Sequence, residues 1–296
     1  MGIQHTEQEK NLLISVITPA YNAEEFIGET IESVINQTYS NWEMIIVDDC
    51  SSDKTVEHVK RYSMQDERIK LVELEENSGS AIARNKAMEE ARGQYIAFLD
   101  SDDLWFPEKL ENQLRFMQQK DIAFSFTKYV RMEEDGTLKN TVSKAPESVG
   151  YTDLLKHCVI GCLTVMIDRE KVGHPKMVNI RTRQDYAYWL TITKKGFRAY
   201  GLPEVLSKYR SVQNSISSNK IKAAKRQWYV YRKVEKKNIF QSLWYFLHYS
   251  SKGLKNLIKF KIVGPKQLIV RIRRCDLVMK TYIQEMLRRK DLLFIW

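Results

Sequence analysis

Three carboxylates stand at the end of a single apolar run. Residues 95–99 read as a buried β-strand, and Asp100, Asp102 and Asp103 follow it directly. Burying unpaired charge is costly, so carboxylates this close together favour a bound cation. Aspartates in the spacing D-x-D supply the hard oxygen ligands that Mg²⁺ or Mn²⁺ prefers when it carries a diphosphate. The alternative is a polar strand terminus that faces water.

A second acidic group lies earlier in the chain. Asp48, Asp49 and Asp53 follow the apolar run 42–47. A carboxylate at a strand end can accept the imide N–H of uracil in a charge-assisted hydrogen bond. Asp53 is equally suited to cap a helix that begins near Thr55.

A third polar stretch, 77–79, leads into a helix that carries Arg84 and Asn85. Both side chains could reach the same edge as the two acidic groups. Ser78 is equally suited to cap this helix at its N-terminus.

The first 128 residues alternate strand-like and helix-like patterns. Helical spacing of apolar residues separates runs that are rich in β-branched residues. The predicted strands are 12–18, 42–48, 69–73, 95–100 and 122–127, and the predicted helices are 24–37, 55–62, 79–91 and one that starts near Pro107. This order predicts an α/β fold, a mostly parallel sheet with helices on both faces. Because ligands bind at the carboxyl ends of such strands, the three polar clusters are expected at one edge.

The alternation lapses after Lys128. Asp135-Gly136 predicts a hairpin turn, and we expect a short helix over 151–156 and a strand over 163–168. A further helix is expected over 183–194, followed by a polar loop over 208–218.

The net charge of +10 is unevenly distributed. Residues 220–296 hold 20 Lys and Arg against four acids, and the rest of the chain holds 27 basic and 33 acidic residues. We therefore expect two physically different pieces, an acidic body over 1–219 that holds the carboxylates and a basic helical extension over 220–296. A family resemblance described below implies that 1–219 is a catalytic domain, with a nucleotide-binding half over about 12–128 and an acceptor half over about 129–219.

The basic extension predicts helices over 221–237, 239–260 and 265–290, with apolar residues such as 243–247 beside lysines. Such helices suit an anionic membrane surface. Contact with another copy of the chain is a second possibility, and nucleic acid is disfavoured because no reader motif accompanies the charge.

No apolar run reaches the ~18–20 residues of a bilayer span. Residues 1–11 lack an apolar signal core, and the sparse cysteines predict reduced thiols, so we expect a cytoplasmic, peripheral place on the inner face of the membrane.

Taken in order, these motifs resemble family 2 glycosyltransferases, which are inverting, nucleotide-sugar-dependent enzymes of GT-A fold. The likeness covers about residues 12–215 and rests on the runs 19–22 (PAYN), 47–53 (VDDCSSD), 77–79 with 83–85 (NSG, ARN) and 98–103 (FLDSDD). With 180–185 and 216–220, the chain further resembles the teichuronic acid biosynthesis glycosyltransferases of Gram-positive bacteria.

The resemblance implies roles at the nucleotide. Asp48 or Asp49 would hold the uracil, and the backbone around Pro19 and Tyr21 would border the base. Arg84 would help to order the site.

The resemblance also implies roles at the diphosphate. Asp100, Ser101 and Asp102 form the D-x-D, in which Asp102 would contact Mg²⁺ or Mn²⁺ directly and Asp100 would lie near the ribose or the metal. Arg210 would close over the diphosphate, or else is a solvated basic strand end.

The family's general base is an acid at the start of a later helix, usually in the pair E-D. Here the matching pair is Gln184-Asp185, which makes Asp185 the expected base and leaves Gln in place of the first acid. Trp189, one helical turn later, could stack on the acceptor, although core packing is favoured.

The expected function is transfer of a sugar from a UDP-sugar to a lipid-linked or growing saccharide acceptor in cell-surface polysaccharide synthesis. A nucleotidyltransferase is a rival, but residues 19–23 offer no Gly-rich, basic phosphate loop. A catalytically silent membrane adaptor on the same fold is the rival outside enzymes.

Overall fold

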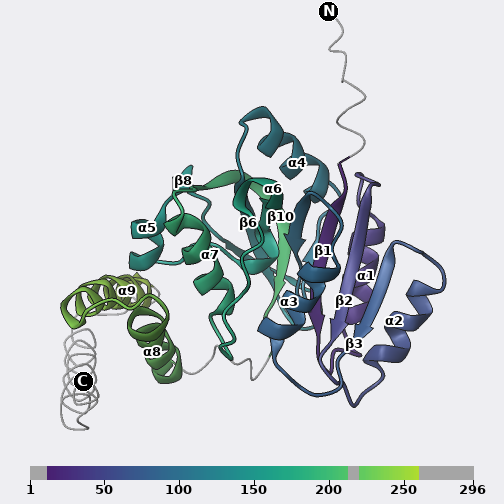
Figure 1. Ribbon diagram of the computed structural model, residues 1–296, viewed down its shortest axis with the longest axis horizontal. Helices are drawn as coiled ribbons and strands as arrows, with labels where there is room; N and C mark the ends of the chain where they lie inside the picture. The colour runs from purple at the N-terminus through teal and green to yellow at the C-terminus, as the bar shows by residue number, and fades with distance from the viewer. Residues whose placement is uncertain (1–11, 213–219, 260–296) are drawn as a thin grey trace, which may run out of the picture. The chain divides into compact units, whose positions relative to one another are not determined.

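The computed structural model of the chain describes residues 12–212 and 220–259 (Figure 1). Its strands are β1 (Ile14–Ala20), β2 (Trp42–Asp48), β3 (Ile69–Glu73), β4 (Tyr95–Phe98), β5 (Leu104–Trp105), β6 (Phe124–Met132), β7 (Leu138–Val142), β8 (Ser148–Val149), β9 (Val165–Asp168) and β10 (Ala199–Arg210). Its α-helices are α1 (Ile27–Ile35), α2 (Thr55–Ser63), α3 (Ser80–Glu90), α4 (Lys109–Gln119), α5 (Tyr151–Lys156), α6 (Arg169–Val172), α7 (Gln184–Lys194), α8 (Lys220–Tyr229) and α9 (Ile239–Lys259).

The strands form one sheet in the order β3-β2-β1-β4-β9-β6-β10-β5, with β7 beside β6 and β8 beside β10. β1 pairs in parallel with β2 and β4, and β6 pairs in parallel with β10. β9 is antiparallel to both of its neighbours, so β4 and β6 still run in the same direction. The predicted α/β fold with a mostly parallel sheet is confirmed.

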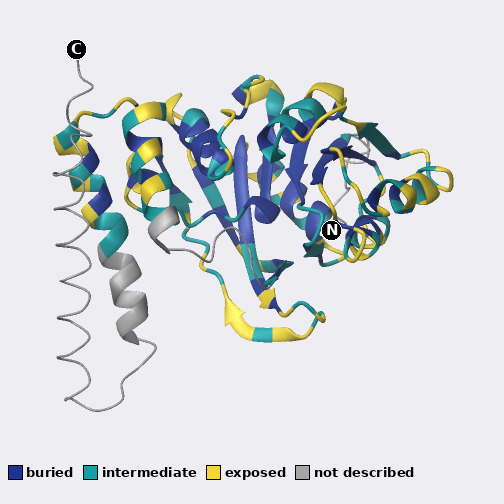
Figure 2. Ribbon diagram, turned by 90° about the horizontal axis from the view of Figure 1, so that it is seen from below, coloured by how far each residue is buried: buried dark blue, intermediate teal, exposed yellow. Residues whose placement is uncertain are grey.

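The core lies between this sheet and its helices. Every residue of β1 and β2 is buried, as the near-continuous apolar runs predict for strands covered on both faces. Helix α1 turns Ile27, Ile31 and Val34 toward them, and each is fully buried. Figure 2 shows the buried strands through the middle of the fold and the exposed residues on the outer helices and loops.

Local patterns predicted several elements to the residue. β2, β3 and α5 have the predicted bounds. The hairpin turn at Asp135-Gly136 joins β6 to β7, and Gly136 has a φ of 87°, which an L side chain rarely adopts.

The predicted polar loop over 208–218 is wrong in its first part. β10 extends through Arg210, pairing with β6 along one side and with β5 at Ser207 and Lys208 along the other. Partners on both sides satisfy the backbone and override the low strand propensity of its polar residues. Residues 213–218 lie outside the described part. The two-residue strands β5 and β8 are too short to show an alternating pattern and were not predicted.

The C-terminal segment divides at a different place from the predicted boundary at 219/220. One compact unit runs from Met1 to Phe246 and the other from Leu247 to Trp296. Within the first, α8 continues into a π-helical turn, η3 (Val230–Val234), whose Tyr231 is fully buried and donates a 2.6 Å hydrogen bond to the carbonyl of Leu155. The described basic residues of this segment lie on its surface, whereas its buried side chains determine which unit it packs with.

The predicted helix over 221–237 is therefore interrupted by η3, and the predicted helix over 265–290 lies outside the described residues. Across 12–212 and 220–259, no helix combines the length and apolar character needed to cross a bilayer.

Candidate active site

The D-x-D lies on a tight turn directly after β4. The backbone N–H of Asp103 donates to the carbonyl of Asp100 over 3.1 Å, which closes the turn. Helix α1 holds this turn in place, because the Thr30 hydroxyl lies 3.0 Å from the carbonyl oxygens of both Ser101 and Asp103. The turn therefore presents its carboxylates on a fixed backbone.

Charge is crowded in this turn. Burial, followed by the charge of Asp100, raises the pKa of Asp102 to about 6. Burial, followed by the charges of Asp102 and Asp100, also raises the pKa of Asp103, which is 1% exposed. Closely spaced oxygen ligands that repel one another fit a hard divalent cation. Among the described residues no group of three or more His, Cys, Asp and Glu side chains is placed to hold a metal ion.

Arg84 is the buried cation beside the turn. It is 5% exposed and pairs through Nη2 with the carboxylate of Asp100. Burial alone would lower its pKa, but the charges of Asp100 and Asp185 among others raise it, so it stays protonated. Its Nε and Nη1 have no hydrogen-bond partner in the described structure. Buried donors of this kind are costly unless a ligand accepts from them.

Asp185 lies in the first turn of α7, where the positive end of the helix dipole stabilises a carboxylate. The preceding Gln184 is 8% exposed and donates from Nε2 to the hydroxyl of Ser80 over 2.7 Å. Since Ser80 begins α3, this bond joins the start of α7 to the start of the helix that carries Arg84. Asp185 is thereby held within electrostatic range of Arg84.

The two aspartates after β2 have different surroundings. Asp49 accepts from the backbone N–H groups of Ser78 and Gly79 at 2.7 and 2.8 Å, which fixes the loop before α3. Asp48 bonds locally, to the backbone N–H and the hydroxyl of Ser51. Both are buried. Of the pair, Asp48 is the one whose oxygens are not committed to a distant segment.

The end of β1 lies beside these aspartates. Pro19 pairs with Val47, and Ala20 pairs with Asp48. Tyr21, the next residue, is 51% exposed. The predicted nucleotide-binding residues of β1 and β2 therefore do share one edge of the sheet, as parallel strands require.

Arg210 does not lie on a mobile loop. It ends β10, is 2% exposed, and donates to the carbonyl of Asp102 at 2.8 Å, the carbonyl of Glu134 at 2.6 Å and the carboxylate of Glu29 at 2.6 Å. Its backbone N–H donates to Asp103 over 2.8 Å. The expected closure over the diphosphate is corrected to a fixed role, because a guanidinium bonded this way braces the D-x-D turn.

Other predicted residues have structural roles. Asn85 exchanges two hydrogen bonds with the backbone of Met177, at 2.7 and 2.9 Å, instead of reaching the site. Asp53 accepts from the backbone N–H of Thr55 at 3.0 Å and so closes the turn ahead of α2, where Lys54 is the N-cap residue. Ser78 makes no cap, because Gly79 is the N-cap residue of α3 and the Ser78 hydroxyl donates to the carbonyl of Glu76 at 3.4 Å.

Trp189 is a core residue. It is fully buried, with its ring centroid 5.5 Å from that of Phe98 and 5.3 Å from that of Phe124. Cys50, Cys158 and Cys162 are free thiols, and Cys275 lies outside the described residues.

Sequence reasoning missed Thr30, and gave no role to Asp103. Thr30 falls on the same face of α1 as Ile27 and Ile31, where an apolar residue is expected, and its hydroxyl supports the turn. A polar residue on an otherwise apolar helix face was the available signal.

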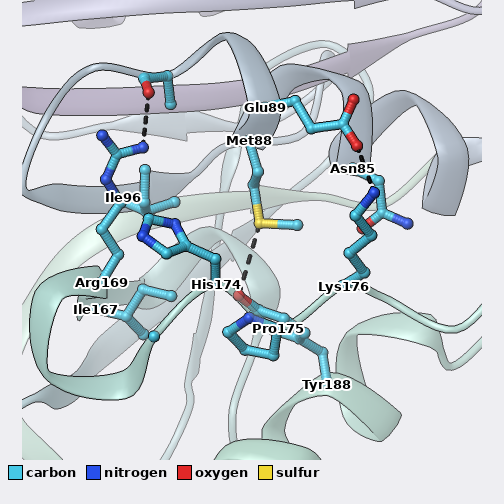
Figure 3. A pocket seen from close by; sticks show the side chains of 12 residues that line it. Asn85, Met88, Glu89, Ile96, Ile167, Arg169, His174, Pro175, Lys176 and Tyr188 are labelled. Atoms are coloured by element: carbon cyan, nitrogen blue, oxygen red, sulfur yellow. Dashed lines mark hydrogen bonds and ion pairs between the residues drawn. The ribbon is translucent and has the colours of Figure 1, made fainter.

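A cavity of about 320 Å³ lies apart from this cluster (Figure 3). Its lining includes Met88 and Tyr188, whose hydroxyl contacts the Met88 sulfur at 3.6 Å, and the ion pair of Glu89 with Lys176. The acidic residues of the site do not line it. The acidic cluster, and not this cavity, defines the candidate active site.

Comparisons with known proteins agree with this geometry. Residues 15–172 match the family described as glycosyl transferase family 2. The chain is 56% identical over 243 residues to a Bacillus subtilis protein named as a teichuronic acid biosynthesis glycosyltransferase, TuaG, covering 82% of this chain and 96% of that one.

A second relative is the Escherichia coli UDP-Glc:α-D-GlcNAc-diphosphoundecaprenol β-1,3-glucosyltransferase WfgD, 43% identical over 82% of this chain and 94% of its own. Among solved structures, the mannosyltransferase PcManGT of Pyrobaculum calidifontis, in complex with GDP-Man and Mn²⁺, superposes with a TM-score of 0.61 over 96% of this chain and 88% of its own. At 18% identity it supports the fold alone. The chain belongs to glycosyl transferase family 2 and is a glycosyltransferase of GT-A fold.

Proposed function

We propose that the protein is an inverting, metal-dependent transferase that moves a sugar from a UDP-sugar to a lipid-linked saccharide in cell-surface polysaccharide synthesis. One observation carries the proposal. The D-x-D turn, Arg84 and the N-terminus of α7 meet through two side-chain contacts, the pair of Arg84 with Asp100 and the bond of Gln184 to Ser80. Leaving-group stabilisation and proton removal can therefore act on one bound substrate.

At the nucleotide end, Asp48 is our candidate acceptor for the uracil N–H. It is 2% exposed and lies at the strand end beside Pro19 and Tyr21. Asp49 would act indirectly, by holding the loop before α3.

At the diphosphate, Asp100 and Asp102 would hold Mg²⁺ or Mn²⁺, with Asp102 the direct ligand. The bound ion would supply positive charge to the departing UDP, so that no general acid is needed. Arg84 adds a second positive charge beside the D-x-D turn. The Mn²⁺ in the PcManGT structure supports this use of the fold.

Asp185 is the proposed general base. It takes the proton from the acceptor hydroxyl while that oxygen attacks carbon one of the sugar from the face opposite the UDP, which inverts the configuration. Gln184 fixes the start of α7 and contributes no second carboxylate, so a single group performs the proton transfer.

The relatives suggest the acceptor. WfgD is named for a diphosphoundecaprenol-linked GlcNAc and a UDP-Glc donor, and TuaG for teichuronic acid biosynthesis. A polyprenol-linked acceptor is anchored in the membrane, so we place this protein on the inner face of the cell membrane as a peripheral enzyme, with residues 220–296 as the membrane-contacting part.

A donor screen tests the proposal. The full chain is incubated with Mn²⁺, a panel of UDP-sugars and a polyprenyl-diphosphate-linked N-acetylhexosamine in detergent, and UDP formation is measured. We expect acceptor-dependent UDP release with at least one donor, abolished by EDTA. Absence of release across the panel would favour a catalytically silent adaptor, and release of pyrophosphate from UTP and a sugar phosphate would favour a nucleotidyltransferase.

A further inference from the structure

Large aromatic side chains stand exposed on the C-terminal part of the first compact unit. Phe240 is 80% exposed and Trp244 is 58% exposed, and in the described part of the chain they are the only exposed Phe or Trp residues. They are four residues apart on α9, which places them on one face of the helix. Tyr229 at the end of α8 is 50% exposed.

The inward side of the same segment is packed. The rings of Phe246 and Trp228 lie 5.8 Å apart, and those of Tyr231 and Tyr245 lie 6.1 Å apart. The residues of the apolar run 243–247 therefore do not all face the same side of the helix. Phe246 is 7% exposed and belongs to the interior, whereas Trp244 faces out.

The segment that carries the exposed aromatic residues is strongly basic. Residues 220–246 contain eight Lys and Arg, and their only acid, Glu235, is 6% exposed and paired with Lys194 at 3.0 Å. We call the exposed residues of this segment the aromatic–lysine surface: Tyr229, Phe240 and Trp244 with Lys225, Lys233 and Lys236.

We propose that the aromatic–lysine surface binds the enzyme to an anionic lipid bilayer. Aromatic rings favour the boundary between headgroups and acyl chains, and lysines beside them attract anionic headgroups. A second copy of the chain fits less well, because a two-fold contact through this surface would set the same lysines against each other. The inference rests on the proposed membrane-anchored acceptor for its purpose, and within residues 220–296 it assigns a contact to residues 220–246, which belong to the first compact unit.

The aromatic–lysine surface is joined to the helix that carries Asp185. Gln227 donates to the hydroxyl of Tyr186, the residue after Asp185, over 3.2 Å. Glu235 accepts from Lys194, at the end of the same helix α7, over 3.0 Å. Docking through α8 and α9 would thus fix the distance of α7, and of Asp185 on it, from the lipid headgroups.

Vesicle sedimentation with the full chain tests this proposal. The vesicles contain equal parts of phosphatidylglycerol and phosphatidylcholine, or phosphatidylcholine alone. Phe240→Ser with Trp244→Ser should lower partitioning into the anionic vesicles at least about tenfold, since each buried aromatic ring is worth a comparable factor. Met64→Ser, which removes an apolar side chain 85% exposed on another surface, is the matched control and should bind like the wild type.

A second variant separates charge from apolar contact. Replacing Lys225, Lys233 and Lys236 by Gln should lower the preference for anionic vesicles at least about tenfold while leaving the melting temperature unchanged. Wild-type binding by both variants overturns the proposal. A wild-type dimer that the aromatic substitutions dissolve, without loss of vesicle binding, overturns it in favour of a contact between copies.

The proposed function can fail independently. UDP release with a detergent-dissolved acceptor should be unchanged in both surface variants, because neither alters the acidic site. If the wild type releases no UDP with any donor, the proposed function fails, and the vesicle measurement still decides the docking proposal.

Discussion

Substituting Asp102 by Asn should stabilise the metal-free protein and abolish its stabilisation by Mn²⁺ with UDP. Burial and the charge of Asp100 raise the pKa of Asp102 from 3.8 to about 6. A carboxyl with a raised folded-state pKa holds its proton more tightly in the native protein. The free energy of unfolding therefore falls as pH rises from about 4 to about 6, and the penalty is fully present above that range.

The size of the effect follows from the shift. About two pH units at about 1.4 kcal/mol per unit give ~3 kcal/mol. Because Asp103 titrates in the same cluster and shares the repulsion, we expect Asp102→Asn to gain ~1–3 kcal/mol at pH ~8 in EDTA and little at pH ~4.5.

Urea unfolding of both proteins at the two pH values measures this gain, and the pH comparison cancels any pH-independent packing change. Mn²⁺ with UDP should then raise the melting temperature of the wild type and leave that of the variant unchanged. A gain that is the same at both pH values, or a loss of stability at the higher one, would refute the electrostatic reasoning.

Three further substitutions test the supporting contacts. Asp49→Ala should cost ~1–2 kcal/mol of unfolding free energy in urea, since two partly buried N–H groups before α3 lose their acceptor; an unchanged midpoint would contradict this. Arg210→Met should cost ~1–3 kcal/mol, because it leaves two carbonyls without their donor while water can solvate the 56% exposed Glu29; a mobile diphosphate-closing arginine would instead affect the KM for donor and spare stability. Tyr231→Phe should cost about 1 kcal/mol through the lost bond to Leu155 if α8 belongs to the catalytic unit, and nothing if it does not.

The shared edge of the site could be predicted from the sequence because strand ends are local features. Apolar runs that stop at Asp48 and Asp100 locate two of its parts, and the parallel arrangement brings them together without knowledge of any contact. The helix α7 was predicted from the apolar spacing of residues 183–194, which is equally local, whereas Asp185 was singled out only by the family resemblance. The strands and helices themselves need only the periods of strand and helix.

Partners far apart in the chain could not be predicted in this way. Arg210 bonds to Asp102 across 108 residues, and Asp49 bonds to Ser78 across 29, so neither contact leaves a local pattern. The polar stretch that contains Arg210 is predicted to be a loop from local sequence alone, because its pairing with β6 and β5 is not visible there. The packing of the C-terminal segment could not be predicted for the same reason, since charge describes its surface and says nothing of the buried Tyr231 in η3.

The most direct test of the account is the separation of binding from transfer in Asp185→Asn. Calorimetry with Mn²⁺ should give a UDP affinity equal to that of the wild type, because Asp185 lies outside the D-x-D turn. UDP release with the lipid-linked acceptor should fall by ~10²–10⁴-fold, the usual worth of a general base. Asp121→Asn, whose carboxylate is 93% exposed, serves as the control and should keep wild-type transfer. Wild-type transfer by Asp185→Asn would contradict the claim that this carboxylate faces the bound donor as the base.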